Sequence, residues 1–334
     1  MEAKQAQHLA MSPGSSPAIA STRLAPVLRT SRLTGRLGAY FALTKPRVVV
    51  LIVFTAVVGM LLGTPTPLNI PVFLLATLGI ALAAGSAAAF NHVLDRRADA
   101  VMARTRARPL PTHQLSTRQA VVFAAALAAV AAATLLIGVN ALTAVLTLSA
   151  LVGYSVVYTI FLKPRTPHNI VIGGAAGAAP PLLGWAAVTG AVSVDALLLF
   201  LIIFIWTPPH FWSLALYREK EYAAAGVPML PVTHGSAFTR RSILGYTLAL
   251  AVVTTLPWGT GMSGTLYLIG ATALNVRFVA YAWQLHRRYS DALSRRMFRF
   301  SINYLAALFA LLLMDRYGPT LGESAQALAA NLLL

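Results

Sequence analysis

The sequence contains no cysteine and few acidic residues. Its 334 residues include 26 Lys and Arg but only nine Asp and Glu, so that the formal net charge is +17. The absence of cysteine excludes disulfide bonds, thiolate metal sites and cysteine nucleophiles. Only 10% of the residues are charged, against about 25% in soluble domains. Together with 57% hydrophobic residues, this composition predicts an integral membrane protein.

The excess of positive charge has two explanations. In a soluble protein it would indicate a nucleic-acid partner. In a membrane protein it indicates loops that lie against the anionic face of a lipid bilayer. Because the chain is so apolar, we expect the lipid bilayer as its partner and no nucleic acid.

The two ends of the chain differ from its middle. Residues 1–38 are rich in Ser, Pro, Ala and Arg and contain no apolar run long enough for a cleaved signal peptide. This composition favours a disordered cytoplasmic tail, with an organelle-targeting peptide as the alternative. Residues 318–334 are expected to form a short C-terminal tail. The membrane domain is therefore expected over 39–317.

Nine apolar runs predict an all-α bundle of about nine transmembrane helices, several of them near the ~20 residues that cross the hydrocarbon. The predicted spans are 48–64, 68–90, 119–138, 140–161, 168–188, 195–216, 242–260, 264–284 and 299–316. Lys and Arg gather before the first span and after the second, fourth, sixth and eighth, whereas the alternate loops have none. The positive-inside rule then places the N-terminus in the cytoplasm and the C-terminus outside. The long polar loops after the second and sixth spans lie inside, where we expect the chemistry.

Acidic residues follow the second span at regular spacing. If that helix continues past its apolar part, Asn91, Asp95 and Asp99 share one face, because side chains four residues apart stack. Oxygen donors in such a row can bind Mg²⁺ together with substrate phosphates, or the two aspartates can simply pair with nearby arginines. Arg104 and Arg108 follow within ten residues and can hold phosphate bidentately, although positive charge is ordinary in a cytoplasmic loop.

Three long motifs carry a resemblance to a known family. "NHVLDRRADAVMARTRARPLP" resembles the first aspartate-rich motif of the UbiA superfamily of intramembrane prenyltransferases. "YTIFLKPRTPHNIVIGGAAGAAPPLLGW" and "WTPPHFWSLALYREKEYAAAGVPMLPVTHG" narrow the resemblance to the branch that farnesylates heme. The resemblance implies nine helices around a central cavity. It also implies transfer of a farnesyl group from farnesyl diphosphate to a vinyl group of heme b, with addition of water, giving heme O and diphosphate. Mg²⁺ is the implied cofactor.

The resemblance also implies roles for particular residues. Asn91, Asp95 and Asp99 match the first metal–diphosphate motif. Glu221 matches the acid of the second motif, and Glu219 is a further candidate beside it. Diphosphate-binding candidates are Arg104, Arg108, Lys163 and Arg165. Of all these, the residues expected to be catalytic are Asp95, Asp99, Lys163 and Glu221.

The acceptor pocket has its own candidates. His210 follows "TPP" inside the sixth span, and we expect it either to ligate the heme iron or to hydrogen-bond a neighbouring group. His168 is a second heme-binding candidate, or a helix cap. Trp206 can stack on a ring or anchor the helix at the membrane interface. Arg277 can meet a heme propionate, pair with an acid, or snorkel to the surface.

Two alternatives remain open from the sequence. One is a UbiA-type prenyltransferase with another aromatic or tetrapyrrole acceptor, and the other is a secondary transporter, although the chain has no clear internal repeat. We expect the bacterial cytoplasmic (inner) membrane, with the active site on the cytoplasmic face; the mitochondrial inner membrane is the alternative. Heme A synthase or oxidase assembly factors are the implied protein partners.

Overall fold

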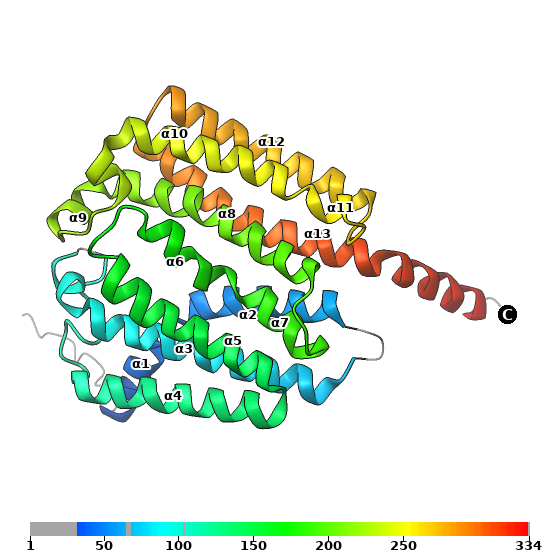
Figure 1. The fold of residues 1–334 in the computed structure, drawn as a ribbon, viewed down its shortest axis with the longest axis horizontal. Coiled ribbons are helices and arrows are strands. Elements are labelled where there is room, and N and C mark those ends of the chain that lie inside the picture. Colours follow the sequence, from blue (N-terminus) through cyan, green and yellow to red (C-terminus); the bar gives the residue numbers. More distant parts are fainter. Residues whose placement is uncertain (1–31, 65–67, 103, 333–334) are drawn as a thin grey trace, which may run out of the picture.

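The structure is a computed structural model that describes residues 32–64, 68–102 and 104–332. Within this part of the chain all regular elements are helices, and Figure 1 shows the long ones side by side in one bundle. The helices are α1 (Arg32–Leu43), α2 (Pro46–Gly63), α3 (Ile70–Val101), α4 (Thr117–Gly138), α5 (Ala141–Val152), α6 (Asn169–Ala178), α7 (Pro180–Thr189), α8 (Val194–Tyr217), α9 (Glu219–Ala224), α10 (Leu230–Val253), α11 (Leu256–Gly259), α12 (Thr265–Arg287) and α13 (Asp291–Leu332). A π-helix over Gly153–Leu162 continues α5.

Nine spans among the described residues are long and apolar enough to cross a membrane, which confirms the number predicted from the apolar runs. Three of them consist of two consecutive segments: α5 with the π-helix, α6 with α7, and α10 with α11. Pro180 begins α7, because proline fits the first turn of a helix but interrupts a continuous one. The second span, α3, continues to Val101, well beyond the predicted end at residue 90.

The predicted tails are only partly within the described residues. Helix α1 begins at Arg32, inside the segment 1–38, and the remainder of that segment, 1–31, lies outside the described residues. Helix α13 runs on to Leu332 through most of the segment 318–334, and Figure 1 shows its end extending past the rest of the bundle.

Polar residues fix where several spans begin. The side chains of Asn69, Asn140 and Ser193 each accept a hydrogen bond from a backbone N–H in the first turn of α3, α5 and α8. At α4, Ser116 and Gln119 form a reciprocal capping box. Such caps contribute about 1 kcal/mol each, and they satisfy backbone groups that lipid cannot satisfy.

Helices α2 and α7 approach until their backbones touch. A Cβ atom on Gly59 would lie 2.0 Å from the carbonyl oxygen of Pro181, and one on Gly184 would lie 2.0 Å from that of Ala56. Only glycine fits at these two crossing points. Close approach through small residues is a common way for membrane helices to pack, and here it joins the first span to the fifth.

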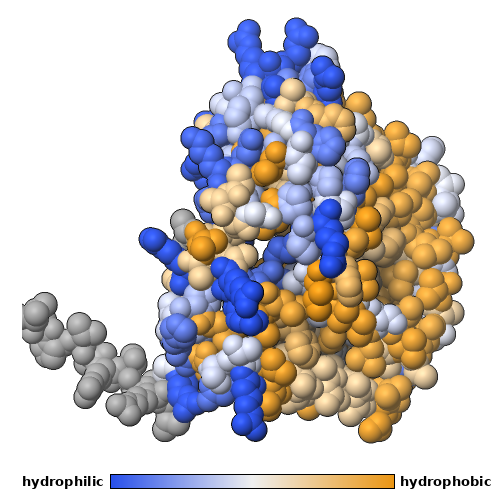
Figure 2. All heavy atoms as spheres, turned by 60° about the vertical axis from the view of Figure 1, so that its left-hand side comes forward, coloured by the Kyte–Doolittle hydropathy of each residue, from blue (hydrophilic) through white to orange (hydrophobic). Residues whose placement is uncertain are grey.

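The outer surface separates into two regions. Figure 2 shows hydrophilic side chains gathered over the end of the bundle that carries α9 and the α3–α4 connection, with a hollow among them. Apolar side chains cover the flank of the bundle in the same view, and large side chains such as Ile137, Ile269 and Val276 are exposed. This arrangement suits a bundle whose flank faces lipid and whose polar end faces water.

Candidate functional site

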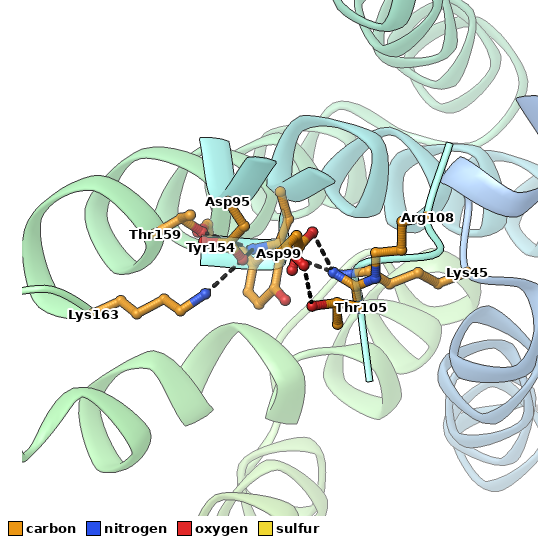
Figure 3. Close-up of polar contacts among 9 residues, drawn as sticks. Lys45, Asp95, Asp99, Thr105, Arg108, Tyr154, Thr159 and Lys163 are labelled. Carbon is orange, nitrogen blue, oxygen red and sulfur yellow. Dashed lines mark hydrogen bonds and ion pairs between the residues drawn. The ribbon is translucent and has the colours of Figure 1, made fainter. Parts of the chain in front are cut away.

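The extension of α3 carries the row of acids. Asn91 and Asp99 are buried, each 4% exposed, and Asp95 is half-buried between them. The Asn91 amide nitrogen donates to the Asp95 carboxylate over 2.9 Å, as expected for residues four apart on one helical face. Figure 3 shows the carboxylates of Asp95 and Asp99 among cationic side chains that come from three other segments.

Lys163 is the cation that meets Asp95. Its ammonium lies 2.5 Å from the carboxylate of Asp95, at the end of the π-helix and 68 residues away in sequence. The backbone N–H of Lys163 bonds to the carbonyl of Tyr158, five residues earlier. The side-chain hydroxyl of Thr159 also donates to a carbonyl five residues earlier, that of Tyr154. The wider turn therefore sets the register with which Lys163 reaches the acids. π-Helical turns are rare and are frequently found at functional sites.

Arg108 is the cation that meets Asp99. Its guanidinium lies 2.7 Å from the Asp99 carboxylate, and both side chains are largely buried. The loop after α3 folds back to make this contact, because the Thr105 hydroxyl donates to the carbonyl of Asp99 over 3.0 Å and the N–H of Thr105 bonds to the carbonyl of Met102. Arg108, which follows Asp99 by nine residues, is thus brought into contact with it.

Lys45 is a functional candidate that sequence reasoning missed. It precedes α2 in a left-handed conformation (φ 51°), and its ammonium contacts the side-chain oxygen of Asn91. Burial, and then the nearby Arg108, lower the pKa of Lys45 to about 7. The sequence offers Lys45 only as part of the positive charge before the first span. Its proximity to Asn91 depends on how α2 packs on α3.

The other predicted members of this site have partners other than the two aspartates. Glu221 pairs with Arg218 over 2.8 Å within its own turn. Glu219 is half-buried and lies within electrostatic reach of Tyr289. Arg165 packs on Phe161.

Arg104 links the α3–α4 connection to α9. Its side chain is exposed and lies near Tyr222 of α9. Burial raises the pKa of the Tyr222 phenol, and Arg104 opposes that rise. The structure thus brings Arg104 toward the turn that carries Glu221.

The donor set suits a metal held partly by its substrate. Among the described residues, no three His, Asp or Glu side chains form a metal-binding group. Mg²⁺, however, is usually bound by one or two carboxylates together with substrate phosphates. Asp95 and Asp99 supply hard oxygen donors on one helical face, and Lys163, Arg108 and Lys45 surround them with positive charge. These residues fit Mg²⁺ with a diphosphate.

His210 lies in a second polar site between α8 and α13. Its imidazole ring stacks on Trp206, with ring centroids 4.3 Å apart, and on Phe298, 4.7 Å away. Its Nδ1 lies 2.7 Å from the hydroxyl of Ser301. Trp206 is 6% exposed and donates its indole N–H to the carbonyl of Ser301, so it is part of the His210 cluster within the bundle.

The two remaining heme-binding candidates are exposed. His168 occupies the N-cap position of α6 without a side-chain capping bond. Arg277 lies on α12, with its guanidinium over the ring of Tyr281 and hydrogen-bonded to the phenol oxygen. Neither makes a contact with His210 among the described residues.

The family model described as the UbiA prenyltransferase family matches residues 52–308. A protein of Thiobacillus denitrificans named protoheme IX farnesyltransferase is 60% identical over 284 residues, which are 85% of this chain and 95% of that protein. A protein of Azoarcus sp. with the same name is 60% identical over 283 residues, 84% of this chain and 95% of the relative.

Solved structures share the fold at low sequence identity. A digeranylgeranylglyceryl phosphate synthase matches with a TM-score of 0.71 at 17% identity, over 84% of this chain and 98% of that one. A UbiA homolog from Archaeoglobus fulgidus bound to DMAPP and Mg²⁺ matches with a TM-score of 0.61 at 18% identity, over 82% and 99%. These matches confirm the expected all-α fold. The chain belongs to the UbiA prenyltransferase family and, within it, to the protoheme IX farnesyltransferases.

Proposed function

We propose that this chain is an Mg²⁺-dependent intramembrane prenyltransferase that transfers a farnesyl group from farnesyl diphosphate to a vinyl group of heme b. Water adds in the same overall reaction, and the products are heme O and diphosphate. The name shared by relatives that are 60% identical supports this donor and acceptor. The observation in the structure that carries the proposal is the pair Asp95 and Asp99, each held by a cation at the polar end of an apolar bundle.

The acids are proposed to bind the diphosphate through Mg²⁺. When bound, Mg²⁺ supplies Lewis-acid stabilisation of the leaving diphosphate. Asp95 and Asp99 would hold it from the first motif, with Asn91 orienting Asp95. Glu221, helped by Glu219, is the proposed acid of the second motif; it would have to leave Arg218 to reach the metal. The solved UbiA homolog that was bound to DMAPP and Mg²⁺ supports a site for a prenyl diphosphate and Mg²⁺ in this fold.

The cations are proposed to stabilise the leaving group directly. The allylic C–O bond of farnesyl diphosphate breaks, and its electron pair leaves with the diphosphate. Preorganised positive groups in a site that excludes water lower the energy of this charge. Lys163, Arg108 and Lys45 already converge on the acids, while Arg104 and Arg165 are proposed to contact diphosphate oxygens farther from the metal.

The acceptor then takes up the farnesyl cation. The π electrons of a heme vinyl group form the new C–C bond, and the carbon left electron-deficient takes up water, which loses a proton. An apolar cavity protects the farnesyl cation from water until that step. His210 and Trp206 are proposed to contact the heme within the bundle, His168 to contact it nearer the polar end, and Arg277 to reach a propionate.

The compartment and partners follow from the same proposal. We place the polar end of the bundle, with Asp95 and Asp99, at the cytoplasmic face of a bacterial inner membrane, because the Lys- and Arg-rich connections gather there. We propose that the N-terminus lies on the same side of the membrane, as the positive-inside rule predicts. Heme A synthase or another oxidase assembly factor is the proposed recipient of heme O.

Product formation tests the proposal. Purified protein in lipid nanodiscs is given heme b, farnesyl diphosphate and Mg²⁺, and farnesylated heme is sought by chromatography and mass spectrometry. We expect product from the native chain and from Asp195→Asn, a control acid in the first turn of α8. We expect none from Asp95→Asn or after chelation. Release of diphosphate without farnesylated heme would contradict the acceptor, and full activity of Asp95→Asn would contradict the site.

A further inference from the structure

The imidazole of His210 is covered on both of its faces. Trp206 stacks on one side at an interplanar angle of 18°, and Phe298 of α13 stacks at 27°. Phe211 meets the ring edge-on, with centroids 5.1 Å apart. A flat macrocycle cannot stack on a ring that is already enclosed in this way. Any ligand must approach His210 in the plane of the imidazole, at one of its nitrogens.

Ser301 determines which nitrogen carries the proton. The Ser301 hydroxyl has a single hydrogen, and its oxygen lies 2.7 Å from the carbonyl oxygen of Phe298. A carbonyl can only accept, so the hydroxyl must donate to it. The same hydroxyl oxygen lies 2.7 Å from Nδ1 of His210. Because the Ser301 hydrogen is already donated to the carbonyl of Phe298, the Ser301 oxygen accepts a hydrogen bond from Nδ1 of His210. Nδ1 of His210 therefore carries the proton.

The other nitrogen of the ring is left with a lone pair. In a neutral imidazole with a proton on Nδ1, Nε2 is an acceptor or a metal ligand. Nε2 of His210 has no hydrogen-bond partner among the described residues. Nε2 of His210 is also not fully enclosed by protein atoms. The two ring nitrogens of His92, by contrast, are fully enclosed and have no hydrogen-bond partner. The lone pair is therefore unused, and Nε2 is not fully enclosed although His210 as a whole is only 9% exposed.

Ser301 also holds the ring that covers His210. The indole N–H of Trp206 donates to the carbonyl oxygen of Ser301 over 2.9 Å. One residue of α13 thus orients the imidazole through its hydroxyl and the neighbouring indole through its backbone. Rotation of the imidazole would break the bond to Ser301 and push against two aromatic rings.

We propose that Ser301 is a positioning residue that holds His210 with its proton on Nδ1, so that Nε2 can ligate the iron of the heme acceptor. This inference rests on the proposed function, since it assigns a ligand to the heme that the reaction consumes. Histidine ligands of metals commonly donate their second N–H to an oxygen acceptor, which fixes the ring and strengthens the ligand. The Ser301 hydroxyl is the acceptor in this case.

Heme binding without turnover tests the proposal. The full chain in nanodiscs is titrated with heme b in the absence of farnesyl diphosphate and Mg²⁺, and absorption and electron paramagnetic resonance spectra are recorded. We expect a histidine-ligated spectrum for the native chain. His210→Ala should lose this signature, and added imidazole should restore it. Ser301→Ala should weaken heme binding about 10- to 100-fold, and Ser301→Thr, which keeps a hydroxyl, should recover most of it.

Ser294→Ala provides the matched control. The Ser294 hydroxyl is buried on the same helix and donates to the carbonyl of Ser213 on α8 over 2.7 Å, so its loss removes a comparable contact between the same two helices. We expect its heme spectrum to match that of the native chain. Equal losses in Ser294→Ala and Ser301→Ala would reduce Ser301 to a packing role and overturn the inference.

The outcomes separate this inference from the proposed function. Heme that binds to His210→Ala with an unchanged spectrum overturns the assigned ligand, while farnesylated heme formed by the native chain still supports the reaction. A native chain that binds no heme and forms no farnesylated heme, yet binds diphosphate, overturns the heme acceptor and the inference together.

Discussion

Replacing Lys163 by Met should slow the chemical step far more than it destabilises the fold. The substitution keeps the length of the side chain and removes the ammonium that lies 2.5 Å from Asp95. If that ammonium stabilises the leaving diphosphate, its loss removes one preorganised positive group. Removal of one such group typically lowers kcat about 100- to 1,000-fold, or about 3–4 kcal/mol of transition-state stabilisation.

The expected cost in stability is smaller. Lys163→Met leaves the Asp95 carboxylate with the amide of Asn91 as its hydrogen-bond donor. Breaking a fully buried ion pair costs about 3–5 kcal/mol, but these two side chains remain 19% and 12% exposed. Water can therefore reach part of the pair, and we expect a loss of about 1–3 kcal/mol. Most of the protein should stay folded at room temperature.

The assay is steady-state formation of farnesylated heme at varied farnesyl diphosphate, with thermal unfolding measured on the same preparations. Lys220→Met, an exposed lysine on α9, is the matched control and should keep native rates. A kcat within threefold of native in Lys163→Met would contradict a role for Lys163 in stabilising the leaving diphosphate. Lys163 would then be only a structural partner of Asp95.

Three further predictions concern a cation, a helix crossing and a helix end. Lys45→Met should weaken binding of inorganic diphosphate about 10- to 100-fold, as for a lost charge-assisted hydrogen bond, because a bound diphosphate would favour the charged form that burial and Arg108 otherwise disfavour, while the unfolding temperature should change little; unchanged affinity would contradict this role. Gly59→Ala should destabilise the fold by about 1–3 kcal/mol because its Cβ would collide with the α7 backbone, whereas Gly245→Ala, which has open space, should not; equal unfolding temperatures would be evidence against the crossing. Asp315→Ala should lower the unfolding temperature by an amount equivalent to about 0.5–2 kcal/mol, because its carboxylate accepts from two N–H groups at the start of α12, and diphosphate affinity should not change; a loss of affinity would link Asp315 to the site.

The sequence predicted those features that repeat along one helix. Apolar runs gave the number of spans, because a helix in lipid must be apolar over a fixed length. The spacing of Asn91, Asp95 and Asp99 placed them on one face, because that relation depends only on helical geometry. The contact between Arg108 and Asp99 could also be predicted, because Arg108 follows Asp99 by only nine residues in sequence. Each of these features is local in the chain.

Features that depend on packing between distant segments were not predictable. The approach of Lys45 to Asn91 joins residues 46 positions apart, and nothing in the composition before the first span distinguishes it from other positive charge. The π-helix that carries Lys163 has no signature in residue type, since a wider turn arises from the fit of the whole span. The pairing of Ser301 with His210 joins α13 to α8, and a serine within an apolar run gives no indication of its partner.

The surroundings of each acidic residue indicate its function better than the small number of acidic residues does. Helix α8 has Asp195 in its first turn, and Asp315 of α13 accepts from the N–H groups at the start of α12; at both places negative charge stabilises the helix through its dipole. Asp99 lies in the last turn of α3 instead, where that dipole disfavours it, and Asp95 lies one turn earlier. A carboxylate at such an end needs cations from elsewhere, and Lys163 and Arg108 provide them. Two acids near the end of their helix, beside cations that a diphosphate can also engage, fit the proposed ligand that binds to both.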